Sequence, residues 1–118
     1  KALTITGAGG ASQITAPSGS PVITVTGDPV VITGVDVNGN DNGSAAVAFD
    51  ATAVPNLRIN GSNLTSALAI DDTAGSSITP QIDATGNWWG QTGGPLTGQV
   101  VSPNSNVDTS TSLASPVP

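Results

Sequence analysis

The chain has 118 residues, of which 36% are hydrophobic, 8% charged and only 3% aromatic, and its net charge is −6. With eight aspartates against Lys1 and Arg58 alone, it lacks the clustered cations that nucleic acids and anionic membranes require of a partner. The apolar residues are almost all Val, Ile, Leu and Ala, and the polar ones mostly Thr, Ser, Asn and Gly, which disfavours a helical fold.

Short β-branched runs recur from the first residues onward and are separated by turn-forming clusters of Gly, Pro, Asn, Asp and Ser. Their apolar pairs have i, i+2 spacing, so both side chains of a pair face one side of a strand. Two lanes can be laid out, with steps of about 20 to 23 residues between members. The first lane is Leu3/Ile5, Ile23/Val25, Val47/Phe49 and Leu68/Ile70. The second lane is Ile14, Ile32, Leu57/Ile59 and Ile78.

A strand followed by a glycine turn recurs at residues 4–7, 24–27 and 31–34, which read TITG, TVTG and VITG. Coils of about 20 to 25 residues whose strands stack on those of the next coil form a solenoid. The spacing therefore predicts one all-β domain, a parallel β-helix of about four to six coils. A β-sandwich is the alternative, because its strands also alternate with turns every 8 to 12 residues.

The segment after this array carries the most specific string in the chain. Residues 82–90 read IDATGNWWG and residues 93–95 read GGP. This segment resembles the A-T-x-N-W/Y-W-G … G-P signature near the last coils of right-handed parallel β-helix surface proteins of the pectin-lyase-like superfamily. Residues 3–10, LTITGAGG, resemble the entry to a first coil, and residues 107–114 resemble a closing segment without its two aromatics. The resemblance implies a right-handed β-helix that is nearly a whole miniature one.

Trp88 and Trp89 are adjacent, so on a strand one faces inward and the other outward. Aromatic bulk at the end of a stack can cover core that no further coil buries. We expect the two tryptophans to cap the last coil and Leu3 and Ile5 to form the opposite interface. Stacking of a sugar on the outward ring is the alternative.

Enzyme chemistry is not expected, because the chain has no His, Cys, Tyr or Glu to serve as nucleophile, thiolate or raised-pKa base. The superfamily that the chain resembles includes hydrolases with paired aspartates and lyases with calcium-held carboxylates and an Arg or Lys base. Arg58 alternates outward from Leu57 and Ile59, which indicates a solvated side chain. Asp71 and Asp72 are adjacent and diverge on a strand unless a turn brings them together.

Calcium is the one metal that the sequence suggests. Asp36, Asn38 and Asn40 offer oxygen ligands at alternate positions, with Asp41 as a fourth. The helix-loop-helix pattern is not met, because its sixth position is Asp41 instead of glycine and its twelfth is not glutamate. Glycine and asparagine turns also form without metal. Both readings stay open, and no other cofactor is predicted.

Three Asn-x-Ser/Thr sequons begin at Asn42, Asn60 and Asn63. They are candidate glycosylation sites if the host glycosylates its exported proteins. In a chain this rich in Asn, Ser and Thr, chance sequons are also expected.

We divide the chain into a β-helix over residues 1–102 and a Pro/Ser/Thr-rich extension or clasp over residues 103–118. No apolar run approaches the roughly 20 residues of a membrane span. The composition favours a secreted or cell-surface protein without enzyme activity. We expect its protomers to stack end to end into a filament or matrix, or to serve as adhesin stalk modules whose neighbours cover both ends. A carbohydrate-binding or carbohydrate-active module is the alternative.

Overall fold

A computed structural model describes residues 3–10, 12–15, 20–26, 29–38, 45–49, 57–73, 82–103 and 107–118. These residues contain eleven short strands and no helix. The strands are β1 (Leu3–Thr6), β2 (Gln13–Thr15), β3 (Ile23–Val25), β4 (Val30–Thr33), β5 (Asp36–Asn38), β6 (Val47–Phe49), β7 (Leu57–Asn60), β8 (Ile70–Asp71), β9 (Ile82–Asp83), β10 (Val100–Val101) and β11 (Val107–Asp108). Across the described ranges, no helix is long and apolar enough to span a membrane.

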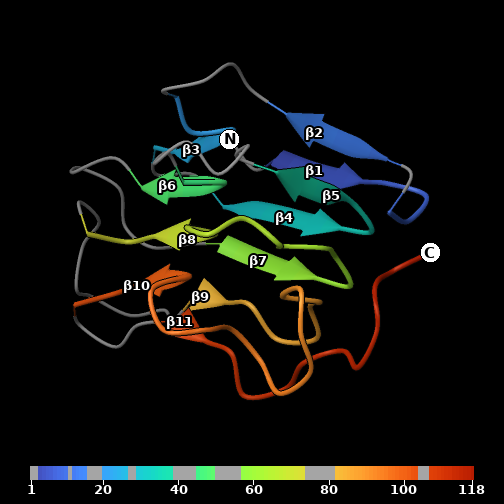
Figure 1. Ribbon diagram of the computed structural model, residues 1–118. Helices are drawn as coiled ribbons and strands as arrows, with labels where there is room; N and C mark the ends of the chain where they lie inside the picture. Colours follow the sequence, from blue (N-terminus) through green and yellow to red (C-terminus); the bar gives the residue numbers. More distant parts are fainter. Residues whose placement is uncertain are drawn as a thin grey trace.

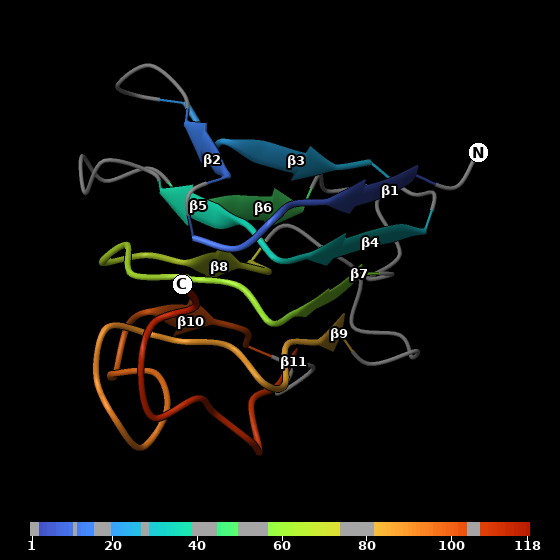
Figure 2. The same cartoon turned by 90° about the vertical axis from the view of Figure 1, so that its right-hand side faces the viewer.

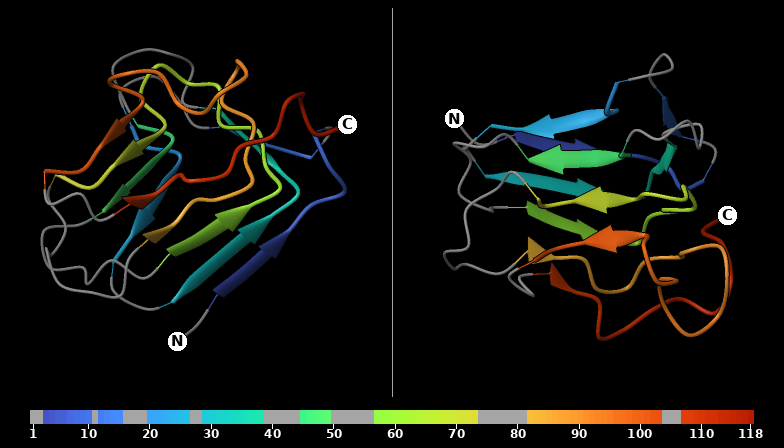
Figure 3. Two further views of the ribbon diagram at one scale, coloured as in Figure 1. Left: turned by 90° about the horizontal axis from the view of Figure 1, so that it is seen from below. Right: turned by 60° about the vertical axis from the view of Figure 1, so that its left-hand side comes forward.

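The strands form three parallel sheets that the chain visits in rotation (Figures 1 and 2). The five-stranded sheet has the order β1-β4-β7-β9-β11, the four-stranded sheet β10-β8-β6-β3, and the two-stranded sheet β2-β5. Seen from below, the two larger sheets face each other across the core (Figure 3). This is the predicted all-β parallel solenoid, so the fold prediction is confirmed. We number the levels of the stack from level 1 at β1 to level 5 at β11.

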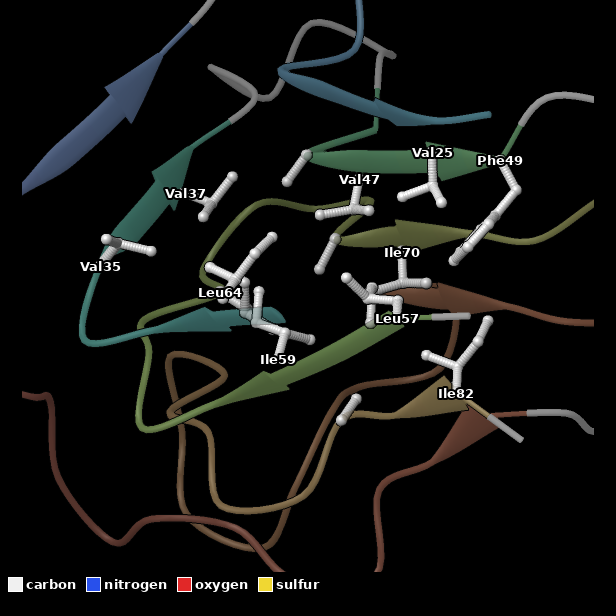
Figure 4. Close-up of a cluster of buried hydrophobic side chains, with 14 of the residues drawn as sticks. Val25, Val35, Val37, Val47, Phe49, Leu57, Ile59, Leu64, Ile70 and Ile82 are labelled. Atoms are coloured by element: carbon white, nitrogen blue, oxygen red, sulfur yellow. The ribbon is translucent and has the colours of Figure 1, made fainter. Parts of the chain in front are cut away.

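The core lies between the sheets and is made by the side chains that the i, i+2 pattern points inward (Figure 4). In the five-stranded sheet, Ile32 and Ile59 are stacked partners and both are 0% exposed. Val47 and Ile70 meet them from the four-stranded sheet and are equally buried. Because strands stack at about 4.8 Å, each inward residue touches the equivalent residue of the next level, and the result is a continuous apolar column.

The two predicted lanes are partly wrong. Leu3 and Ile5 pair with Val30 and Ile32, so they belong to the five-stranded sheet and not to the lane of Ile23. Ile14 pairs with Val37 in the two-stranded sheet instead of sharing a lane with Ile32. The predicted lane members Ile23/Val25, Val47/Phe49 and Ile70 do share one sheet, as do Ile32 and Leu57/Ile59. Ile78 lies outside the described residues.

The lanes failed because a coil has three strands, whereas two were assumed. Leu3 pairs with Val30 and Val30 with Leu57, a step of 27 residues, and Arg58 pairs with Asp83 at a step of 25. Both steps are longer than the predicted 20 to 23 residues. The extra length of each coil accommodates the third strand and its turn.

A glycine follows the five-stranded sheet at four successive levels, at residues 7, 34, 61 and 86. Gly34, Gly61 and Gly86 have φ values of +68°, +58° and +68°, which non-glycine residues rarely adopt. A Cβ on Gly7 would lie 2.3 Å from the Gly34 carbonyl oxygen. The repeated strand-glycine strings at 4–7 and 31–34 therefore form one corner of the solenoid, while Gly27 lies outside the described residues.

Candidate functional site

The two ends of the stack differ from its middle in how well they cover their inward side chains. One column of the five-stranded sheet contains Leu3, Val30, Leu57, Ile82 and Val107, one residue per level. Leu3 is 52% exposed, whereas Leu57 is 3% and Ile82 0% exposed. Val30 and Val107 are half-buried. The same type of inward residue is thus buried in the middle and open at the ends, because no further coil covers it.

The backbone at both ends is also half paired. In a parallel sheet, alternate residues of a strand bond to one neighbour and the others face the opposite neighbour. β1 pairs only with β4, and β11 only with β9, within the part of the chain that the structure describes. Each outer strand therefore presents a row of backbone donors and acceptors that another strand could pair with.

The two tryptophans lie on opposite sides of the chain, as expected for adjacent residues in an extended segment. Trp89 is 0% exposed and lines the interior at level 4, and Trp88 is half-buried and bridges to Asn63. The buried indole Nε1 of Trp89 has no hydrogen-bond partner among the described residues. A fully buried ring offers no face for stacking a sugar.

A cleft of about 400 Å³ lies beside Trp89, lined by Thr65, Ala67, Trp89, Gly90, Gln91, Leu96, Thr97 and Gln99. Leu96 on its wall is 62% exposed. Gln99 is 5% exposed and its amide is fully used, because Nε2 donates to the carbonyls of Ser66 and Trp89, both at 3.1 Å, and Oε1 accepts from the Leu96 amide at 2.7 Å. Gln91 Nε2 donates to the same Oε1 at 3.2 Å and to the Gly94 carbonyl. The buried amide in this cleft therefore organises the loop and has no group left for a ligand.

Arg58 forms an ion pair with an aspartate of the next strand instead of standing alone. Its Nε lies 3.5 Å from Asp83 Oδ2, with side chains 64% and 38% exposed. Asp83 Oδ1 also accepts from the Thr85 amide at 3.1 Å, the Thr85 hydroxyl at 2.7 Å and Asn60 Nδ2 at 3.1 Å. Desolvation acts to raise the pKa of Asp83, but the bonds from Thr85 and Asn60, with Arg58, together lower it. Asp83 is thus a stable anion that ties β7 to β9 on the outer face.

Asp71 and Asp72 diverge, as adjacent residues on a strand should. Asp71 is half-buried, and its Oδ1 accepts from the Thr73 amide at 2.9 Å. Asp72 is 1% exposed, its Oδ2 accepts from the Ser102 hydroxyl at 3.1 Å, and its Oδ1 has no hydrogen-bond partner among the described residues. Burial raises the pKa of Asp72, an effect that the Ser102 bond opposes and the Asp71 charge reinforces. The two carboxylates do not form a pair that could share a substrate.

Only half of the candidate calcium ligands can be placed. Asp36 and Asn38 lie at the two ends of β5, on the same side of the strand, and both are half-buried. Asp36 Oδ1 has no hydrogen-bond partner within the described ranges, and burial raises the pKa of Asp36. Asn40 and Asp41 lie outside the described residues. No group of three or more His, Cys, Asp or Glu positioned for a metal ion occurs in the ranges that the structure describes.

The sequon asparagines that can be placed use their amide nitrogens within the chain. Asn60 Nδ2 donates to Asp83 Oδ1 and, at 2.8 Å, to the Thr85 carbonyl. Asn63 is 6% exposed, its Nδ2 donates to the Val117 carbonyl at 3.3 Å, and its Oδ1 accepts from the Val117 amide at 2.8 Å. A glycan on either nitrogen would have to displace these bonds. Asn42 lies outside the described residues.

Sequence reasoning missed a repeated strand ending. Asp71, Asp83 and Asp108 each accept, through Oδ1, the backbone N–H two residues later, from Thr73, Thr85 and Ser110. These Asx turns stop β8, β9 and β11 after their second residue. The recurring Ile/Val-Asp-x-Thr/Ser spacing was the signal that could have revealed them.

Asn87 is the other residue that was missed, although it stands inside the motif at 82–90. It is 0% exposed, its Oδ1 accepts from the Ser62 amide at 3.1 Å, and its Nδ2 donates to the carbonyls of Ile59 and Ala84 at 2.7 and 2.9 Å. One side chain therefore satisfies three backbone groups of levels 3 and 4.

Comparisons with protein-family models, with curated proteins and with solved structures find no match to this chain.

Proposed function

We propose that this chain is an extracellular structural protein without enzyme activity, whose copies associate end to end into a filament or matrix on a cell surface. The observation that supports this most is the exposure gradient along the Leu3 column, from 52% at level 1 to 0% at level 4. A second copy placed with its last coil against β1 would continue both the column and the backbone ladder.

The energetics favour such a contact. Covering Leu3 and the half-buried Ile5, Ile14 and Ile23 removes apolar surface from water at about 25 cal/mol per Å². Pairing the free edge of β1 adds backbone hydrogen bonds without new side-chain requirements. The first and last coils are different surfaces, so the contact is head to tail and does not close on itself. A stalk module of a longer adhesin fits the same geometry if neighbouring modules cover both ends.

The carbohydrate-binding alternative has one observation in its favour, the cleft beside Trp89. Its wall offers the exposed side chain of Leu96 and the hydroxyls of Thr65 and Thr97. The buried Trp89 ring and the fully bonded Gln99 amide leave this reading with less support than end-to-end association.

Negative-stain microscopy and sedimentation velocity of the whole chain at increasing concentration test the proposal. Threads should form with an axial repeat of about 25 Å, five levels at about 4.8 Å each. Leu3→Asp should abolish them by placing a charge in the joint. Val31→Asp is the matched control, because Val31 lies at level 2 on the outer face, where its register neighbours are Thr4 and Arg58.

The two variants separate an end contact from a general loss of solubility or fold. Both should keep the strand signal in circular dichroism, and only Leu3→Asp should stay monomeric. A wild-type chain that remains an 11.4 kDa monomer at every concentration would overturn the proposal. Threads that survive Leu3→Asp would overturn the assignment of the joint to β1.

A further inference from the structure

The last residues of the chain return along the side of the solenoid to its first coil. After Leu113, whose amide donates to the Asn87 carbonyl at 2.9 Å, the chain rises past level 3 and reaches the turn that follows β1. Figure 3 shows this segment beside the loop at residues 7–10. Three hydrogen bonds fix it: the two between Asn63 and Val117, and one from the Gly10 amide to the Pro118 carbonyl at 2.7 Å.

The place where residues 117 and 118 lie accepts a backbone and little else. A Cβ on Gly9 would come within 2.1 Å of the Pro118 carbonyl oxygen, and a Cβ on Gly10 within 2.4 Å of the Val117 carbonyl oxygen. Asn63 uses both ends of its amide on the backbone N–H and C=O of Val117, which is the pairing that a neighbouring strand would make. We call the surface formed by Gly9, Gly10 and Asn63 the tail groove.

The segment in the tail groove is held lightly. Ala114, Ser115 and Pro116 are exposed, and Val117 is only half-buried. The three hydrogen bonds contribute about 0.5–1.5 kcal/mol each. None of the residues 114–118 belongs to the buried core. The segment can therefore leave its groove while the solenoid stays folded.

We propose that the tail groove also receives residues 114–118 of a second copy, so that neighbouring copies exchange these segments. All three bonds are made with the backbone of the segment, so they are the same whichever copy supplies it. Exchange of an identical element is a low-cost route to association, because each groove is refilled by the contact it has lost. Within one chain the segment has an effective concentration in the millimolar range, and copies held in contact reach a comparable value.

This inference rests on the proposed self-association for bringing copies together, but it concerns the side of the solenoid and not its ends. Exchange would lock a stacked assembly that the end contacts alone have begun. Since residues 109–113 precede the segment and stay with level 5, they act as the hinge.

The test uses the whole chain in two isotopic forms. Chains at natural abundance carry the diazirine amino acid photo-leucine in place of Val117, which keeps the backbone N–H and C=O. They are mixed in equal amounts with uniformly ¹⁵N-labelled wild-type chains at a concentration where assembly is seen, and then illuminated. Val117 Cγ1 lies 3.7 Å from the position of a Gly9 Cβ, so the probe is within reach of the groove.

Exchange predicts cross-links between a light tail and heavy peptides that contain Gly9, Gly10 or Asn63. Asn63→Leu in the heavy chain should lower these mixed cross-links at least fivefold, because leucine offers neither the donor nor the acceptor. Cross-links confined to light groove peptides would overturn the proposal, and so would mixed cross-links scattered over the chain and insensitive to Asn63→Leu.

The outcome also separates this inference from the proposed function. Threads in the microscope together with light-only cross-links leave end-to-end stacking in place and refute the exchange. Absence of assembly at every concentration refutes the stacking directly, whatever the cross-links.

Discussion

Removing the side chain of Asn87 should destabilise the fold more than any comparable change of an outward asparagine. In Asn87→Ala, the Ser62 amide loses its acceptor, and the carbonyls of Ile59 and Ala84 each lose a donor, all in a fully buried place. An orphaned buried N–H costs about 1–3 kcal/mol. Each carbonyl has a second lone pair, so we assign it about 0.5–1 kcal/mol. The expected loss is about 2–5 kcal/mol, a large share of the roughly 5–15 kcal/mol of a typical domain.

The measurement is urea unfolding followed by the fluorescence of the two tryptophans. With a slope of about 1.5 kcal/mol per molar urea, a loss of about 3 kcal/mol lowers the midpoint by about 2 M. Asn60→Ala is the matched control. Asn60 also donates through Nδ2, to Asp83 and Thr85, but it is half-buried, so water can replace it and the expected loss is about 0.5–1.5 kcal/mol.

Asn87→Asp adds a pH signature to the same argument. Aspartate keeps an acceptor for the Ser62 amide but points a carboxylate at two carbonyl oxygens. Its pKa in the folded state should therefore be raised, and the variant should regain stability as the pH falls toward the unfolded value of about 3.9. Equal losses for Asn87→Ala and Asn60→Ala would refute the reasoning from burial.

Three further predictions concern the aspartates and the tail groove. The pKa of Asp83 is lowered in the fold, so its contribution is present above the unfolded value of 3.8 and lost as the pH falls through the folded pKa. Asp83→Asn should lower the urea midpoint at pH 7 and have little effect at pH 2. The pKa of Asp72 is raised, so the protein should lose stability as the pH rises from 3.8 through that pKa. Asp72→Asn should flatten this fall in thermal midpoints between pH 3 and 7, and an unchanged slope would contradict it. Gly10→Ala should speed amide hydrogen exchange at Val117 about tenfold, because its Cβ would meet the Val117 carbonyl; an unaltered rate would count against the tail groove.

The inward face of each strand could be predicted from sequence, but the partner of each strand could not. The i, i+2 pattern identified Leu57/Ile59 and Val47/Phe49 as buried pairs, and they are. It could not say which sheet a pair joins, because all three sheets share that period and Val30 and Val35 were not counted. Leu3 was thus placed with Ile23 although its partner is Val30.

The polar contacts were harder to foresee for a physical reason. Asn87 and Gln99 act on backbone groups of neighbouring coils, at separations of 25 to 33 residues for the bonds to Ser62 and Ser66. Nothing in their local sequence distinguishes them from the many surface asparagines and glutamines of such a chain. Arg58 was expected to be solvated, which its 64% exposure bears out, but its ion pair with Asp83 depends on the register of β7 and β9.

The bond between Gly10 and Pro118 changes how the solenoid is expected to fold and come apart. An open stack of coils behaves as a one-dimensional array that can fray from either end, since each coil interacts only with its neighbours. Here the contacts join residues 108 and 54 positions apart, so loss of the last level first requires release of the tail. Closing so long a loop is entropically unfavourable until the coils between its ends are in place. The contact should therefore form after the rate-limiting step, and weakening it should speed unfolding while leaving the folding rate unchanged.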